Sequence, residues 1–166
     1  TYTPHENPNG IWYGTLEKIS GEFIYTGRNG YKRTFEAVSG TEYYRLKEIE
    51  DAEENKIQFY YDGTEWKMTK VEHDSGLTYT FDYDGNDRVA TMTAAMNGTS
   101  QSWEYLYDSS PFLTKVSIVG SSESLALEWD SVGNITKKTY GDSTSEGFEY
   151  DDEWRVTKIT DTDDKT

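Results

Sequence analysis

The sequence of 166 residues contains no cysteine, only three prolines and two histidines, and no long apolar run. The missing cysteine excludes disulfides, thiolate metal sites and cysteine nucleophiles from this chain. Because no segment approaches about 18 consecutive apolar residues, we expect no helix that spans a membrane. The few prolines leave no evident linker, so we expect residues 1–166 to form a single all-β domain.

Positive charge is also scarce. Lysine and arginine number 16 against 31 aspartates and glutamates, a formal net charge of −15. Nucleic acids and anionic membrane surfaces attract proteins of the opposite sign, so we expect neither as a partner. Hydrophobic residues make up only 34% of the chain, yet aromatic residues reach 15%, which is too many for a disordered acidic polymer. A folded domain with a thin, tyrosine-rich core fits both values.

An aromatic residue followed by aspartate recurs through residues 57–160. The aromatic members of these pairs, which we call anchors, are Tyr61, Tyr83, Tyr107, Trp129 and Tyr150. Their positions differ by 22, 24, 22 and 21 residues. Large residues alternate before each anchor, as at Ile57 and Phe59, and a period of two indicates a strand with one buried face. A polar loop and a second short strand follow each anchor, so this region is predicted to hold five β-hairpin repeats.

Residues 1–54 carry a degenerate form of the same pattern. Four segments favour strands: Ile11–Ile19, Glu22–Tyr25, Tyr31–Val38 and Tyr43–Ile49. Gly27-Arg28-Asn29-Gly30 is a strong turn signal between two of them, and the acidic stretch 48–54 either ends a strand or forms a short helix.

The whole pattern predicts an all-β fold, an antiparallel up-and-down meander of about 12–14 strands curled into a soluble, barrel-like sheet. Solubility is expected because outward positions carry charges such as Glu149 and Lys158, which a membrane barrel would place against lipid at high cost. The pattern leaves open whether the sheet closes or keeps two free edges.

Side-chain volume suggests how the two strands of each hairpin pair. In the last repeat we expect three cross-strand pairs: Phe148 with Ile159, Glu149 with Lys158 and Tyr150 with Thr157. A large anchor opposite a small residue lets a thin core interdigitate. The same rule places four other small residues opposite the remaining anchors: Thr69, Ala90, Thr114 and Thr136. Glu128 and Lys137 are then a second outward pair of opposite charge.

The unit Tyr-Asp-x-x-x-Arg-Val-Thr-Lys-Ile at residues 150–159 is similar to the YD repeat of Rhs and teneurin-type proteins. The chain resembles still more closely a family of secreted or lipid-anchored Bacteroidetes proteins of unknown function with a porin-like β-barrel fold. This resemblance implies export to the cell surface or periplasm, or secretion, with a lipid-modified cysteine upstream of these residues. The chain departs from the repeat where Trp154 and Asp87 replace the glycine before arginine, and where Trp129 replaces the anchor tyrosine.

Three large rings fall in or beside the hairpin loops: Trp66, Phe112 and Trp154. Aligned on neighbouring hairpins, they would form a ligand-binding platform for sugar rings. The alternative is that they fold over the end of the core and close it, because large rings stabilise a thin sheet by burying area. The sequence favours this second interpretation.

Asp82, Asp84 and Asn86 place oxygen ligands around one turn and make a weak candidate for calcium. An EF-hand loop would need glycine at the sixth position, where Asp87 stands, and glutamate at the twelfth, where Thr93 stands. Aspartate, glycine and asparagine are also ordinary turn residues, so we expect turn chemistry here and no cofactor.

No catalytic residue can be assigned. His5 and His73 are the only histidines, and neither has a nucleophile signature beside it. Our first hypothesis is therefore an exported, non-catalytic module that binds an extracellular glycan, peptide or lipid. The second is a structural scaffold of a cell-surface assembly, and the third is a glycoside hydrolase using a carboxylate pair. The sequence does not indicate the oligomeric state.

Overall fold

The computed structural model describes residues 14–63 and 66–162. These residues form fourteen strands joined by turns, and none of them forms a helix that could cross a membrane. The strands in chain order are β1 (Thr15–Ile19), β2 (Glu22–Thr26), β3 (Lys32–Ala37), β4 (Tyr44–Glu50), β5 (Lys56–Tyr61), β6 (Met68–His73), β7 (Thr78–Tyr83), β8 (Val89–Met96), β9 (Thr99–Tyr107), β10 (Leu113–Ile118), β11 (Ser124–Trp129), β12 (Ile135–Tyr140), β13 (Ser145–Tyr150) and β14 (Val156–Asp161).

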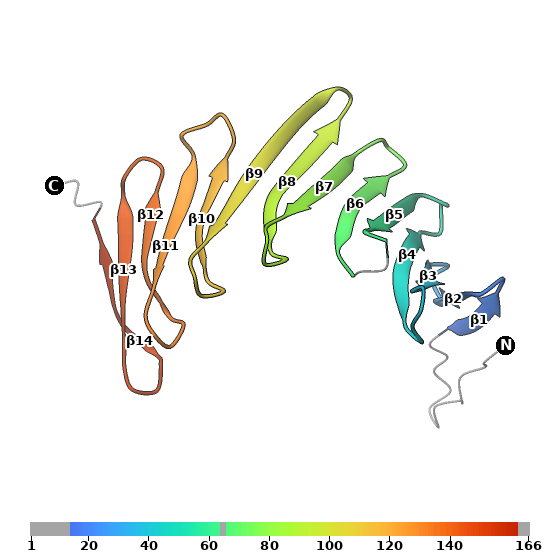
Figure 1. Cartoon of the computed structure of the whole chain (residues 1–166), viewed down its shortest axis with the longest axis horizontal. Helices are drawn as coiled ribbons and strands as arrows, with labels where there is room; N and C mark the ends of the chain where they lie inside the picture. The colour runs from blue at the N-terminus through green and yellow to red at the C-terminus, as the bar shows by residue number, and fades with distance from the viewer. Residues whose placement is uncertain (1–13, 64–65, 163–166) are drawn as a thin grey trace. The chain divides into compact units, whose positions relative to one another are not determined.

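The strand order of the sheet is the order of the sequence, from β1 to β14 (Figure 1). Tight turns join successive strands, so each strand pairs with its chain neighbours in antiparallel fashion. The predicted all-β meander is thus confirmed. Among the described strands, β1 and β14 each end the order, so the sheet is not closed into a barrel, and a porin-like closure is not confirmed.

The chain divides into two compact units. The first contains Thr1–Phe81 and Ala94–Ser100, and the second contains Asp82–Thr93 and Gln101–Thr166. The division runs through β7, β8 and β9.

The strands predicted for the N-terminal third are present as β1 to β4, although residues 11–13 of the first prediction lie outside the described residues. The glycine-rich turn forms as expected: the Gly27 N–H donates to the Tyr31 carbonyl at 2.8 Å. The acidic stretch ends β4 at Glu50 and then turns, so the helical alternative is wrong.

The predicted register is right along most of β13 and β14 but wrong at the anchor. Phe148 pairs with Ile159 and Glu149 with Lys158, whereas Tyr150 pairs with Val156 and leaves Thr157 as an extra residue in a bulge. The same bulge recurs where Tyr61 pairs with Met68, Tyr107 with Leu113 and Trp129 with Ile135. The threonines placed opposite these anchors are therefore the bulged residues.

In two of these hairpins, the bulged threonine binds the opposite strand. In the last hairpin, the Thr157 hydroxyl donates to the Glu149 carbonyl at 3.2 Å, and in the β9–β10 hairpin the Thr114 hydroxyl donates to the Leu106 carbonyl at 3.1 Å. A bulge increases the local twist and re-aims the neighbouring side chain. In these hairpins the bulge places the first residue of the second strand, such as Val156, opposite the anchor ring.

The interior of each unit is thin, as the composition suggested. Among the described residues, only Val38 and Ser145 are buried, with exposed fractions of 1% and 8%. The anchors are half-buried on one face, and the other face carries the predicted ion pairs Glu149–Lys158 at 2.7 Å and Glu128–Lys137 at 3.6 Å. Within each unit, the described strands form one layer, with no helix or second sheet of that unit stacked upon it.

Candidate functional site

The aspartate after an anchor holds its own turn together. The Oδ1 atom of Asp151 accepts the N–H groups of Glu153 and Arg155 at 3.0 and 2.9 Å, and its Oδ2 accepts Arg155 Nε at 2.8 Å. Asp84 and Asp130 bind the residues two and four positions later in the same way. One carboxylate thus satisfies two backbone donors and a side chain, which fixes the length of the loop.

These turns require an unusual backbone conformation at the third residue after the aspartate. That residue is Gly133 in one copy, with φ of 97°, but it is Asp87 in another and Trp154 in the last, with φ of 64° and 65°. The left-handed region costs a non-glycine residue roughly 1–2 kcal/mol. The two departures from the repeat are therefore sites of backbone strain.

The anchors use their polar atoms as well as their rings. Each of four anchors donates a hydrogen bond to a carbonyl on the preceding strand. The bonds are Tyr61 Oη to Leu46 O at 2.7 Å, Tyr107 Oη to Val89 O at 2.9 Å, Trp129 Nε1 to Leu113 O at 2.7 Å, and Tyr150 Oη to Ile135 O at 2.7 Å. Trp129 is thus a functional replacement for tyrosine, because its indole N–H makes the same bond.

In three of these copies, the residue before the accepting carbonyl lies over the anchor ring. The Arg45 guanidinium is 4.5 Å from the centre of the Tyr61 ring, and the Arg88 guanidinium is 4.4 Å from that of Tyr107. In the third copy, Phe112 stacks on Trp129 with ring centres 5.0 Å apart. We call each two-residue unit a ring clamp: Arg45–Leu46, Arg88–Val89 and Phe112–Leu113.

Arg88 also joins one hairpin to the next. It forms an ion pair with Asp84 at 2.8 Å, and its Nη1 donates to the carbonyls of Asp108 and Ser110, both at 3.3 Å. One arginine therefore holds its own turn, stacks on the following anchor and binds the following turn. These contacts join the turns of two consecutive hairpins.

The hydrogen bonds within the turns shift the acidity of their carboxylates. Backbone hydrogen bonds, chiefly from Arg88, lower the pKa of Asp84, and bonds from Asn134 and Arg155 lower the pKa of Asp130 and Asp151. Asp51, in the turn between β4 and β5, has a lowered pKa mainly because the Asn55 side chain donates to it. Burial raises the pKa of the anchors Tyr61 and Tyr107, which keeps their hydroxyl donors protonated.

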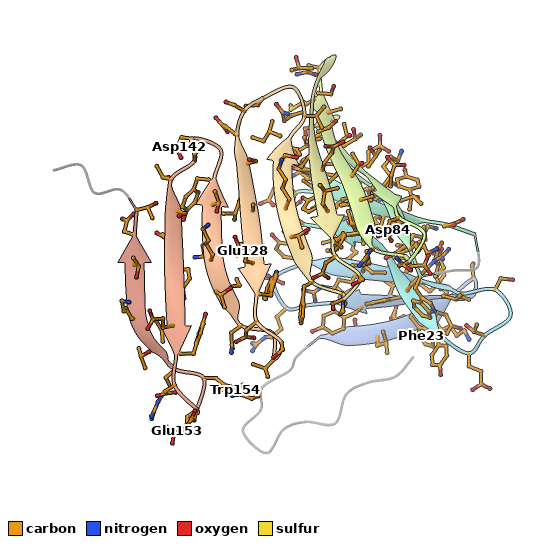
Figure 2. The ribbon with its side chains drawn as sticks, turned by 60° about the vertical axis from the view of Figure 1, so that its left-hand side comes forward. Phe23, Asp84, Glu128, Asp142, Glu153 and Trp154 are labelled. Carbon is orange, nitrogen blue, oxygen red and sulfur yellow. The ribbon has the colours of Figure 1, made fainter. Side chains whose placement is uncertain are left out.

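The three rings predicted to bind a ligand have different surroundings. Phe112 belongs to a ring clamp and packs on Trp129, whereas Trp154 stands at the tip of the β13–β14 turn with 63% of its surface exposed (Figure 2). Trp66 lies edge-on to Tyr43, with ring centres 5.9 Å apart, and both rings are more than half exposed. Phe112 thus packs on an anchor and not on Trp154, which lies in a different turn of the same unit.

Of the three candidate calcium ligands, Asp84 and Asn86 make hydrogen bonds within the turn. Asp84 binds its own backbone and Arg88, and Asn86 contributes its N–H to Asp84 at 2.8 Å, while Asp82 is exposed one residue before the anchor Tyr83. Residues 14–63 and 66–162 contain no group of three or more His, Asp or Glu side chains placed to hold a metal ion.

His73 ends β6, and His5 lies outside the described residues. The Nδ1 atom of His73 lies 2.8 Å from Ser75 Oγ and accepts the Ser75 N–H at 3.0 Å. Because the same nitrogen binds the backbone two residues later, the contact caps the turn between β6 and β7. In this contact, the His73 Nδ1 atom is the acceptor of the Ser75 N–H.

Sequence reasoning missed the ring clamps. For two of the three clamps a signal was present at the fourth residue after the anchor aspartate, which is Arg88 or Phe112, whereas Arg45 follows no such aspartate. The pairing of Arg88 or Phe112 with a ring about twenty positions later needs the three-dimensional register. Sequence reasoning also missed Asp51, whose turn bonds to Glu53 and Asn55 match those of the repeats although no aromatic residue precedes it.

Comparison with known proteins shows a family and similar solved structures. The family model described as teneurin YD-shell matches residues 14–165. A chain in the crystal structure of TcdB2-TccC3-Cdc42 is similar with 12% sequence identity and a TM-score of 0.45, covering 92% of this chain and 12% of that chain. This chain has no match among curated proteins.

Proposed function

Since the chain belongs to the teneurin YD-shell family, we propose that it is a structural, non-catalytic segment of a protein shell in an extracellular or cell-surface assembly. YD-repeat shell proteins are typically extracellular or located at the cell surface, which agrees with the export implied by the repeat. Lipid anchoring and a periplasmic location are finer forms of this proposal. The scaffold hypothesis therefore takes precedence over the ligand-binding module.

One observation carries the proposal: the polar groups that define the repeat act on the protein's own backbone. The carboxylates of Asp84, Asp130 and Asp151 hold their turns, and anchor hydroxyls such as that of Tyr107 bind the preceding strand. Arg88 completes the set by joining two successive turns. Residues used in this way make each hairpin rigid and repeat the same structure along the chain, as the wall of a protein shell requires.

The single layer is the second support. A sheet normally buries one face against another element, yet within each unit the apolar face of the described strands is covered by no helix or second sheet of that unit. The wall of a shell accounts for this arrangement, because an enclosed or adjoining partner would cover its apolar inner face.

A specific observation favours one competing function. The Tyr43–Trp66 pair presents two exposed rings, of 66% and 53% exposure, beside the β5–β6 loop. Such a pair would suit stacking on a sugar ring, with a glycan as the ligand. Calcium, peptides and lipids are further ligands of this binding-module alternative.

A thermal-shift panel separates the two functions. A ligand at 100 times its Kd adds about 2.7 kcal/mol to native stability, which for a domain of this size is several degrees in Tm. The scaffold proposal expects no reproducible shift with calcium, glycans, peptides unrelated to the repeat, or lipids. A shift with one class that disappears in Trp66→Ala would replace the scaffold by a binding module, with Trp154→Ala as the matched control.

A further inference from the structure

Two asparagine–glycine pairs lie in turns of the described residues: Asn29-Gly30 between β2 and β3, and Asn97-Gly98 between β8 and β9. In such a pair the backbone nitrogen of the glycine can attack the side-chain amide of the asparagine, because glycine has no side chain to obstruct the approach. All four residues are exposed. The two pairs therefore share the same local chemistry and the same access to water, and they differ in their contacts.

The first pair is held in its turn. The Gly30 N–H donates to the Gly27 carbonyl at 3.1 Å, and the Asn29 Oδ1 atom accepts the Tyr31 N–H at 3.4 Å. A methyl group at Gly30 would lie 3.3 Å from the Ala52 Cβ atom, so the backbone at Gly30 is packed against the β4–β5 turn. The nitrogen that would attack and the amide that would be attacked both have partners.

The second pair has no such partners. Asn97 and Gly98 have φ of 52° and 79°, the left-handed values of a two-residue hairpin turn of type I′. Among residues 14–63 and 66–162, none forms a hydrogen bond with the Gly98 N–H or with the Asn97 side chain. A methyl group at Gly98 would meet no heavy atom within 4 Å beyond its chain neighbours. The attacking nitrogen is thus free, and the ring that it must form has room.

We propose that Asn97 is a site of spontaneous deamidation, which converts the tip of the β8–β9 hairpin into an aspartyl or isoaspartyl turn. The Gly98 nitrogen loses its proton to water and bonds to the Asn97 Cγ atom, and ammonia leaves, so that a succinimide ring joins the two residues. Water then opens the ring. Cleavage of the bond from this nitrogen to Cγ gives aspartate, and cleavage of its bond to the main-chain carbonyl carbon of Asn97 gives isoaspartate. In sum, water hydrolyses one amide and ammonia is released, with no oxidation or reduction.

The modification changes the charge and the length of the turn. Either product adds one negative charge to a chain whose formal net charge is −15. The isoaspartyl product also routes the backbone through the side-chain methylene, which lengthens a loop of only two residues. β8 and β9 are the longest strands of the described sheet, and the Thr93 and Ser102 hydroxyls lie 2.8 Å apart across them. We expect the isoaspartyl form to loosen the pairing between that contact and the turn.

The test is peptide mapping of the unmodified full chain during incubation in mildly alkaline buffer. Samples are digested at mildly acidic pH, where deamidation is slow, and mass spectrometry follows the succinimide and its products at Asn97 and Asn29. The bond from Gly30 to the Gly27 carbonyl has to break before Gly30 can attack. Conversion at Asn29 should therefore be slower than at Asn97 by about 2- to 12-fold, which corresponds to a hydrogen bond of about 0.5–1.5 kcal/mol.

The same chain in urea is the matched control, because unfolding removes the turn contacts and leaves the sequence unchanged. There the two pairs should convert at equal rates. Equal rates in the native chain, faster conversion at Asn29, or a native ratio that persists in urea would each overturn the proposal. So would an Asn97 that stays unconverted in the native chain while it converts in urea.

Hydrogen exchange tests the effect on the hairpin. Amides in residues 94–101 should exchange faster in the isoaspartyl form, separated by ion-exchange chromatography, than in the fresh chain. Asn97→Asp is the control, because it adds the charge without the extra methylene and should leave this exchange unchanged. Equal acceleration in both would overturn the assignment of the effect to the longer turn. None of these results bears on the shell function, since the reaction needs only the turn itself.

Discussion

The anchor position selects a ring that carries a hydrogen-bond donor. Size alone would admit phenylalanine, which occurs two residues earlier at Phe59, Phe81 and Phe148 but not among the five anchors. The difference follows from the carbonyl groups of Leu46, Val89, Leu113 and Ile135, each of which accepts the donor of the anchor on the next hairpin. Leaving a partly buried carbonyl unpaired costs free energy, so the donor is kept even where tryptophan replaces tyrosine.

The first prediction concerns this donor. Tyr150→Phe keeps the ring and removes the bond to the Ile135 carbonyl, so the free energy of unfolding should fall by about 0.5–1.5 kcal/mol. Tyr60→Phe is the matched control, because its hydroxyl contacts the exposed side chains of Gln58 and Glu72. Denaturant titration of both variants measures the difference. Equal losses would show that the backbone bond of the anchor has no special weight.

The second prediction concerns backbone strain at the tip of the last turn. Trp154 has φ of 65° and an exposed ring, so Trp154→Gly should raise the free energy of unfolding by about 1 kcal/mol by relieving the left-handed conformation. Asp152→Gly in the same turn has no positive φ to relieve and should lower stability by about 0.5–1 kcal/mol. Thermal unfolding compares them. A loss in the tryptophan variant would mean that the ring makes a stabilising contact.

At the scale of the hairpin, the sequence predicts the strands well and the anchor register poorly. Alternation of large residues locates both strands of each repeat because burial of one face imposes a period of two. It cannot locate the bulge at Thr157, because a bulge shifts the pairing without changing the alternation within either strand. The recurrence of threonine at positions 69, 114, 136 and 157 was the available signal, and its hydroxyl bond to the opposite strand explains it at Thr114 and Thr157.

The candidate site shows the same limit. The aspartates of the repeat were identified as turn residues from local chemistry, and the structure gives them that role at Asp84 and Asp151. The ring clamps join residues on different hairpins, such as Arg88 and Tyr107. Contacts of this kind depend on strand register, so a pattern read within one repeat does not contain them.

The third prediction is a pH dependence of the hairpin turn. Hydrogen bonds from Arg155 lower the pKa of Asp151 in the folded protein below its ordinary value of 3.8. The charged carboxylate therefore adds stability that is fully present above about pH 3.8 and is lost as the pH falls through the lowered pKa. The stability gap between the native chain and Asp151→Asn should be constant from pH 7 to 5 and shrink below pH 4.

Urea titrations across that range measure the gap. Asp152→Asn is the matched control, because it makes the same chemical change at a carboxylate that accepts no hydrogen bond from the described part of the turn. A gap for Asp151→Asn that persists at pH 2 would show that the turn depends on the shape of the side chain and not on its charge.

At the scale of the whole molecule, stability is distributed along the chain. Each strand pairs with its sequence neighbours, and the ring clamps join adjacent hairpins, so each hairpin draws its support from the ones beside it. In repeat proteins of this kind, stability is approximately a sum of unit terms and nearest-neighbour terms. Among the described residues only Val38 and Ser145 are buried, so neither unit has a central core that couples its own distant strands.

The last prediction follows from this distribution. Tyr150→Ala removes the ring and the bond to the Ile135 carbonyl and should cost about 3 kcal/mol, at the low end for an aromatic truncation because the ring is half-buried. Hydrogen exchange should accelerate in β12, β13 and β14 and stay unchanged in β1 to β5, because local opening needs only the contacts of neighbouring strands. Glu149→Ala, one residue away on the charged face, should cost under about 1 kcal/mol and leave the exchange pattern unaltered. A uniform acceleration from β1 to β14 in Tyr150→Ala would instead demonstrate one cooperative unit.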